Sequence, residues 1–233
     1  MNAQFLAIAR DPSTIPGVHH YCDEWCDYCP VTARCLAFRC TAEFRRRHRR
    51  RQGDATFASI EEAVAFTREV SALDGSSTGE LDAILANPPG ESGLETADPL
   101  ASVAWDYAVS AAFLFTLQSM TVAHRPRRSS GPAPEQVVLW HHLRIYMKVV
   151  RALISGERAR GGDGASEDAN GCVRLVLVSV ERSRAALTTL RSSANAPEVD
   201  HLIEGLHELE RGLEQRFPRG RAYVRVGIDC PVA

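Results

Sequence analysis

The residues best suited to chemistry in this chain are a group of closely spaced cysteines. Five of the seven cysteines fall within residues 22–40, and four of them, Cys22, Cys26, Cys29 and Cys35, follow the spacing C-x3-C-x2-C-x5-C. Thiolates are soft ligands for iron and zinc, and short gaps bring several of them together with little loss of chain entropy. Four thiolates held this closely repel one another unless a cation lies between them. The sequence therefore predicts a metal site with these four ligands.

The spacing of the cysteines bears on which metal they hold. Four thiolates satisfy either a tetrahedral zinc ion or a 4Fe–4S cluster. Structural zinc sites typically use two C-x2-C pairs, whereas this loop has a single such pair, Cys26 and Cys29. Pro30 directly follows Cys29, as proline follows a ligand cysteine in bacterial ferredoxins. The pattern favours the 4Fe–4S cluster, with zinc as the alternative cofactor.

About ten residues of the same loop resemble a known family. The Cys26–Cys29 pair, the Pro-Val that follows it and then Cys35 with Leu36 are similar to the cysteine loop of the WhiB-like iron–sulfur proteins. The resemblance implies a 4Fe–4S cluster, with one further upstream cysteine as a ligand. In this chain that cysteine is Cys22, which lies closer to the pair than in the family. The resemblance bears on the type of metal and carries no prediction of transcriptional control.

Three neighbouring residues are candidate accessory ligands. His19 and His20 immediately precede the cysteines and would act as a fifth ligand or a proton relay, although a polar loop pair is the simpler interpretation. Cys40 is the third candidate, although a buried position within a helix is the simpler interpretation. Trp25 and Tyr28 lie between the ligands, and we expect them to shield the site from water.

A run of arginines follows the cysteine loop. The run consists of Arg45, Arg46, Arg47, Arg49, Arg50 and Arg51. Six guanidinium groups make a local positive field that can bind phosphates, so nucleic acid is a candidate partner. Residues 54–106 carry eleven acidic residues and one arginine, which favours a solvated helix end paired with acidic neighbours. We expect any binding to nucleic acid to be weak and sensitive to salt.

The composition limits which other classes of protein the chain can belong to. The chain has 233 residues, a hydrophobic fraction of 45% and a net charge of −2, enough for a real core and without a global charge suited to nucleic acid. Residues 1–17 lack the pattern of a secretory signal, and Asp106 interrupts the longest apolar stretch. We therefore expect a cytoplasmic protein without a membrane partner. No catalytic motif is found in the sequence, so it assigns no enzymatic activity.

The elements that must position the site are predicted to be helices. Apolar periodicity, caps and Pro/Gly punctuation predict helices over residues 32–51, 54–72, 78–86, 99–123, 134–155, 173–191 and 197–217. In the helix over residues 134–155 we expect an inward face made of Trp140, Leu143, Met147, Val150 and Ile154, and we expect His141 on a solvated stripe. The inward residues expected over 197–217 are Val199, Leu202, Leu206, Leu209 and Leu213. Ser59 with Glu62 fits a capping box, and Asp98 with Pro99 fits a helix start. Residues 156–171 are glycine-rich and predict a flexible linker, and alternation over residues 221–228 predicts an extended tail.

These elements predict a mainly α fold, with an N-terminal cysteine-rich metal loop, a helical bundle and a short extended tail. The expected parts are a metal-binding segment at residues 1–53, an acidic helical connector at 54–98 and a four-helix bundle with the tail at 99–233. The sequence favours an iron–sulfur protein for electron transfer or redox sensing, with a redox protein as a candidate partner. The alternative is a zinc-stabilised helical module that binds a protein or a nucleic acid.

Overall fold

The fold is mainly α-helical, as the sequence predicts. The computed structural model describes residues 2–15, 17–48, 57–75, 98–119, 131–159, 163–192 and 195–230. Contacts divide the chain into two units: Met1–Gly90 with Arg225–Ala233 (unit 1), and Glu91–Val224 (unit 2). The division differs from the expected boundaries at residues 53 and 98, because the helix after the arginine run and the end of the chain both belong to unit 1.

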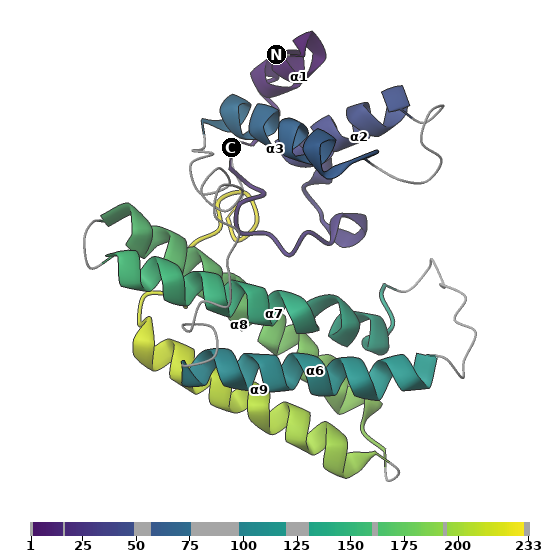
Figure 1. The fold of residues 1–233 in the computed structure, drawn as a ribbon, viewed down its shortest axis with the longest axis vertical. Helices are drawn as coiled ribbons and strands as arrows, with labels where there is room; N and C mark the ends of the chain where they lie inside the picture. The colour runs from purple at the N-terminus through teal and green to yellow at the C-terminus, as the bar shows by residue number, and fades with distance from the viewer. Residues whose placement is uncertain are drawn as a thin grey trace. The chain divides into compact units, whose positions relative to one another are not determined.

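Unit 1 is built from short helices around the cysteine loop (Figure 1). Its described elements are α1 (Ala3–Arg10), the 3-10 turns η1 (Cys26–Tyr28) and η2 (Thr32–Arg34), α2 (Leu36–His48) and α3 (Ile60–Asp74). The predicted helix over residues 32–51 was too long at its start, because Cys35 is extended and separates η2 from α2. The predicted helix over residues 78–86 lies outside the described residues.

A small aromatic cluster holds together the three α-helices described in unit 1. Phe5 of α1, Phe44 of α2 and Val70 of α3 are buried in it, and the rings of Phe5 and Phe66 meet edge to face at 5.7 Å. Burial of such side chains stabilises by about 1.5–3 kcal/mol each. The cluster therefore fixes the start of α2, where Cys35 lies, against α1 and α3.

The ends of α3 follow the sequence signals closely. Ser59 caps the N-terminus by accepting a hydrogen bond from the backbone N–H of Glu62, as the capping box predicts. The helix begins at Ile60, later than predicted, because this cap fixes its first turn. At the other end Gly75 adopts a left-handed conformation with φ of 73°. Residues with a side chain rarely adopt this conformation, so glycine is favoured there. Gly75 thus makes Asp74 the last residue of α3.

Hydrogen bonds tie the segment after α1 to the start of α2. Arg39 pairs with Asp11 at 2.7 Å and donates to the hydroxyl of Thr14. Ile15 forms a single parallel bridge with Cys35. Residues 11–15 therefore lie alongside the last of the four clustered cysteines.

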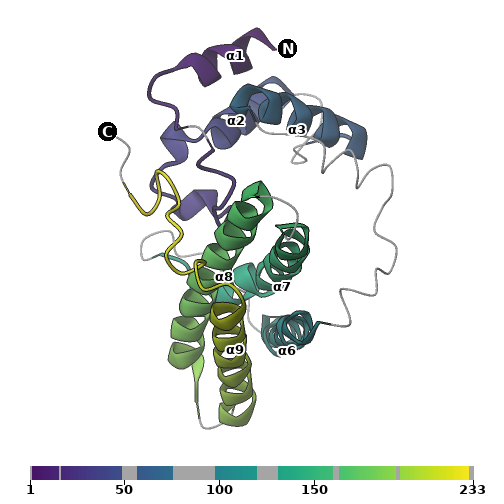
Figure 2. The same cartoon turned by 90° about the vertical axis from the view of Figure 1, so that its left-hand side faces the viewer.

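Unit 2 is a four-helix bundle in its described residues. Its helices are α6 (Pro99–Ser119), α7 (Pro134–Arg158), α8 (Asp163–Leu190) and α9 (Ala196–Arg216). Contacts join α6 to α7, α7 to α8, α8 to α9 and α9 back to α6, so the chain runs up and down around one core (Figure 2). Asp98 starts α6 by accepting from the N–H of Leu100, as predicted.

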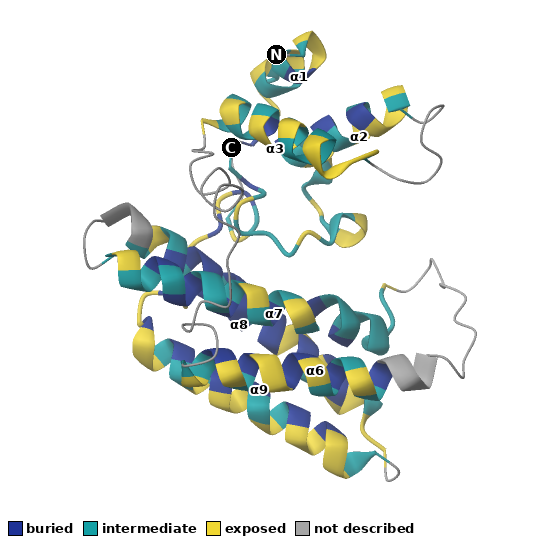
Figure 3. Ribbon diagram, in the orientation of Figure 1, coloured by how far each residue is buried: buried dark blue, intermediate teal, exposed yellow. Residues whose placement is uncertain are grey.

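The core of the bundle matches the predicted inward faces in part (Figure 3). The five inward residues expected on α9 are all buried; they are Val199, Leu202, Leu206, Leu209 and Leu213. The face expected on α7 was wrong, because Leu143 and Met147 are about half exposed while His141, Ile145 and Val149 are buried. His141, expected on a solvated stripe, lies fully in the core.

The prediction of a flexible linker at residues 156–171 was also wrong for the part of that range that the structure describes. Helix α7 continues to Arg158, and α8 begins at Asp163. Asp168 accepts hydrogen bonds from Arg151 at 2.8 Å and from Ser155 at 2.6 Å. These contacts with α7, together with burial of Ala169, overcome the weak helix propensity of the segment.

The last described residues form turns instead of one extended segment. Residues 218–222 are turns, and Val226 bridges to Cys230 around a second turn in which Gly227 has φ of 80°. The positive φ of Gly227 interrupts the predicted alternation. No helix in the described part of the chain is long and apolar enough to cross a membrane.

Candidate metal centre

The four predicted ligands converge on one cavity of unit 1. Cys22, Cys26, Cys29 and Cys35 all line a cavity with about 290 Å³ of empty space, counting its opening to solvent. No disulfide joins them; each thiol is free. The sequence spacing thus brings all four side chains to one place, although they come from a loop, a 3-10 turn and the start of a helix.

Two of the thiols lie on a tight turn. Cys26 begins η1, and the N–H of Cys29 donates to the carbonyl oxygen of Cys26 at 3.3 Å. A single 3-10 turn places residues three apart on the same side. The C-x2-C pair therefore presents both sulfur atoms to the cavity.

Cys35 is positioned by the start of α2. It directly precedes Leu36, and its sulfur accepts hydrogen bonds from the backbone N–H groups of Ala37 and Phe38. These N–H groups have no helical partner of their own, and the positive end of the helix dipole favours a negative sulfur there. Local structure therefore fixes the position of Cys35, one of the four predicted ligands.

Cys22 is held by the turn that follows it. Its thiol donates to the carbonyl oxygen of His19 at 3.3 Å, and the backbone N–H of Glu24 points to its sulfur. Glu24 has φ of 55°, a left-handed conformation that costs a residue with a side chain about 1–2 kcal/mol. This strained residue returns the chain from Cys22 toward Cys26.

The environment of the thiols favours their neutral form until a cation arrives. Burial, with a smaller effect from Glu24 and Cys35, raises the pKa of Cys22 to about 12. Burial and the neighbouring thiols also raise the pKa of Cys26 and the pKa of Cys35. A metal cation would reverse these shifts, because bound thiols are deprotonated.

The spacing of the sulfur atoms bears on the kind of metal. Among the described residues, the one group of three close metal-ligand atoms contains no cysteine. The four thiols therefore line one cavity without forming a preformed tetrahedral zinc site, in which Zn–S bonds of about 2.3 Å would place the sulfurs about 3.8 Å apart.

The end of the chain contributes to the wall of the cavity. Ile228 lines it and packs against Ile15, Val18 and Cys35. Arg225 and Asp229 pair at 2.7 Å and close the turn that carries Ile228. A residue almost two hundred positions from the cysteine loop thus helps to shield it, which local sequence patterns could not reveal. Trp25 also lines the cavity, as its predicted shielding role requires.

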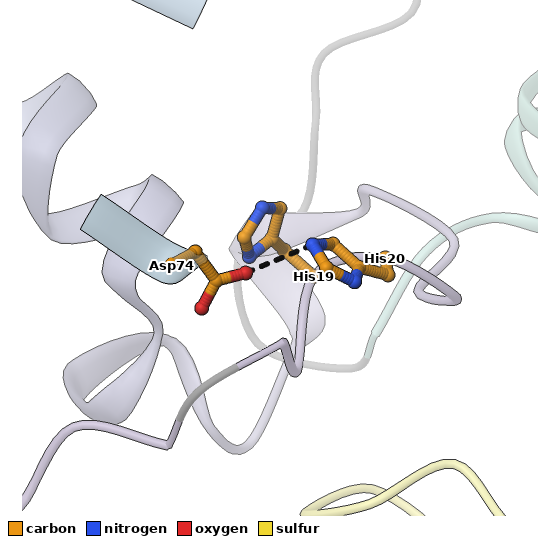
Figure 4. A group of neighbouring side chains, drawn as sticks. All are labelled: His19, His20 and Asp74. Atoms are coloured by element: carbon orange, nitrogen blue, oxygen red, sulfur yellow. Dashed lines mark ion pairs between the residues drawn. The ribbon is translucent and has the colours of Figure 1, made fainter. Parts of the chain in front are cut away.

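The two predicted accessory histidines meet a carboxylate that the sequence did not single out. His20 Nε2 lies 2.8 Å from Asp74 Oδ2 (Figure 4). A nitrogen of each histidine and an oxygen of Asp74 all lie within 4.8 Å of one another. His19 also lines the cysteine cavity. The only sequence signal for Asp74 was its place before the helix-ending Gly75.

Charge and burial shape this second group. Burial, followed by repulsion from His20, lowers the pKa of His19. Burial alone would raise the pKa of Asp74, but hydrogen bonds from His20 and from the N–H of Gly17 hold it below its usual value. His19 is therefore neutral and Asp74 ionised near pH 7.

The other candidate residues lie apart from the cavity. Cys40 is fully buried in the aromatic cluster, where burial raises its pKa to about 11. It is a core residue and does not line the cavity. In the arginine run, Arg46 and Arg47 both bind Glu43, at 2.8 and 2.7 Å, and Arg45 is exposed on α2. Arg49, Arg50 and Arg51 lie outside the described residues.

No protein-family model, no characterised protein and no solved structure matches the chain.

Proposed function

We propose that the chain is an iron–sulfur protein that holds a 4Fe–4S cluster through Cys22, Cys26, Cys29 and Cys35, for electron transfer or redox sensing. The observation that carries the proposal is the convergence of these four thiols on one cavity. The donor set fits the cluster, since iron–sulfur clusters are held by four cysteine thiolates. No other set of four soft ligands occurs in the described residues.

One further feature supports a cluster over zinc. The four thiols line one cavity but are not among the close ligand groups found in the described residues, as a preformed site for a single tetrahedral ion would be. The irons of a cluster occupy separate corners, so its thiolates lie farther apart than those around one ion.

The surroundings of the thiols suit a redox role. Trp25 and Ile228 cover the cavity with apolar surface, and exclusion of water is one way in which a protein sets a reduction potential. The N–H groups of Ala37, Phe38 and Glu24 directed at the sulfurs are a second, because hydrogen bonds to sulfur tune the potential. The cluster would supply the one-electron chemistry; these residues would set its potential and its exposure.

The test is an anaerobic absorption spectrum of the full chain before and after addition of dithionite. A cluster gives a brown protein whose broad visible absorption bleaches on reduction. A colourless protein that retains zinc through the same cysteines would instead support the zinc-stabilised interaction module. Bleaching that reverses in air or with ferricyanide is the result expected for a redox-active cluster.

A further inference from the structure

The group formed by His19, His20 and Asp74 has the donor set of a transition-metal site without sulfur. One ligand atom from each residue lies within 4.8 Å of the other two. Figure 4 shows both imidazole rings turned toward the carboxylate. Two imidazoles and one carboxylate with an open position are a common ligand set for zinc and for ferrous iron.

The carboxylate of Asp74 is buried at the C-terminal end of α3, so its negative charge depends on the groups that face it. Its side chain is 1% exposed, and it is the last residue of α3. The C-terminal end of a helix carries a partial negative charge, and a buried carboxylate needs a compensating partner. A cation held beside Asp74 would offset both effects.

One imidazole nitrogen in the group is unsatisfied in the described structure. Nδ1 of His19 is buried and has no hydrogen-bond partner, whereas buried polar atoms are nearly always paired. A metal ion accepts the lone pair of such a nitrogen. A buried ligand nitrogen is expected to lack a hydrogen-bond partner in this way when no metal ion is bound to it.

The backbone orients the group in the way that metal sites require. The N–H of Gly17 donates to Oδ1 of Asp74 at 2.8 Å, which leaves Oδ2 directed at His20. Gly17 has φ of 67°, and the N–H of His20 donates to its carbonyl oxygen at 3.0 Å. Hydrogen bonds of this kind to a ligating carboxylate hold it in position for a metal.

From this geometry we propose that His19, His20 and Asp74 form a second metal site, separate from the cysteines, for a divalent ion of the zinc class. Three protein ligands leave the fourth tetrahedral position to water. Because His19 also lines the cysteine cavity, the two sites are neighbours within unit 1.

The site is tested by equilibrium dialysis of the anaerobically purified full chain against Zn²⁺, with zinc, iron and sulfide measured on the same samples. We expect His20→Ala and Asp74→Asn to weaken the binding of one zinc equivalent at least tenfold. X-ray absorption spectroscopy at the zinc edge of the wild-type chain should find only nitrogen and oxygen ligands around that ion, at about 2.0–2.1 Å. His201→Ala removes an exposed histidine of α9 and should leave zinc binding unchanged.

Unchanged zinc binding in His20→Ala would overturn the proposal, as would sulfur at about 2.3 Å around the added ion. If Asp74→Asn disturbs folding, His20→Gln decides, because His20 is 38% exposed and glutamine preserves a hydrogen bond to Asp74. This result can be distinguished from failure of the proposed cluster. Loss of the cluster would lower the iron and sulfide content. Loss of the second site would lower only the zinc bound by the variant relative to wild type.

Discussion

The two units of the chain bury their apolar residues in different ways. In the bundle, helices of 21 to 28 residues bury a continuous row of side chains along their length. In the described part of unit 1 the α-helices have 8 to 15 residues, and the buried apolar residues fall into two small clusters, one of which contains Cys35.

The difference indicates where each unit obtains its stability. A continuous core can support the bundle without any ligand, whereas small domains with little core commonly depend on a metal. Unit 1 also carries a strained Glu24 and, around one cavity, a buried Cys35 with three half-buried thiols. We therefore expect the bundle to fold without metal and unit 1 to require it.

The largest expected effect separates the cysteines of the two units. Cys29→Ser should abolish cluster binding, because three thiolates and a hydroxyl no longer satisfy four irons. Cys172→Ser, buried in α8 of the bundle, should retain it. Iron and sulfide analysis of both variants measures the effect, and full iron content in Cys29→Ser would remove this residue from the ligand set.

Removal of the metal should affect one unit only. Without a cation, the four thiols around the cavity lose the partner that would hold the loop, so the order of unit 1 should decrease. Hydrogen exchange after chelation under anaerobic conditions should show loss of protection in α2, with protection kept in α7, α8 and α9. Equal loss of protection in both units would contradict the contrast between them.

Truncation of a core leucine in each unit sharpens the same contrast. Leu206→Ala in α9 and Leu36→Ala in α2 each remove a fully buried side chain, and each should destabilise its unit by about 2–5 kcal/mol. Only Leu36→Ala, next to Cys35, should also lower the iron content. Thermal unfolding and metal analysis of the two variants provide the matched test.

A smaller effect is expected at Gly17. Its φ of 67° places it in the left-handed region, where an added side chain costs about 1–2 kcal/mol. Gly17→Ala should destabilise unit 1 by about this amount. Gly205→Ala is the control, because a Cβ at Gly205 of α9 meets nothing within 4 Å; alanine there should stabilise slightly. Denaturant unfolding of both variants measures the difference.

The smallest expected effect concerns Glu43, which binds Arg46 and Arg47. These hydrogen bonds lower the pKa of Glu43 from 4.5 to about 2. Its ionised form therefore stabilises α2 at pH above 4.5, and the contribution is lost as the pH falls toward 2. Glu43→Gln should lower the free energy of unfolding of unit 1 by less than about 1 kcal/mol at pH 7. The loss should be smaller still near pH 2. A difference that grows at low pH would contradict this role.

The sequence predicted those features that depend on neighbouring residues. The meeting of four cysteines at one cavity follows from their close spacing, and burial of the predicted inward leucines of α9 confirms their 3.6-residue pattern. The capping box at Ser59 and the start of α6 at Asp98 are local for the same reason.

Features that depend on distant contacts were missed. Asp74 joins His20 and Gly17 from more than fifty residues away, and Ile228 reaches the cavity from the end of the chain. On α7, burial of His141 in place of Leu143 follows from which helices surround it. No pattern within one helix specifies its neighbours.

The central claim is that unit 1 is organised around a 4Fe–4S cluster. Its most direct test is the iron, acid-labile sulfide and zinc content of the anaerobically purified full chain. We predict about four irons and four sulfides per chain. A chain with no iron and about one zinc bound by sulfur would contradict the claim.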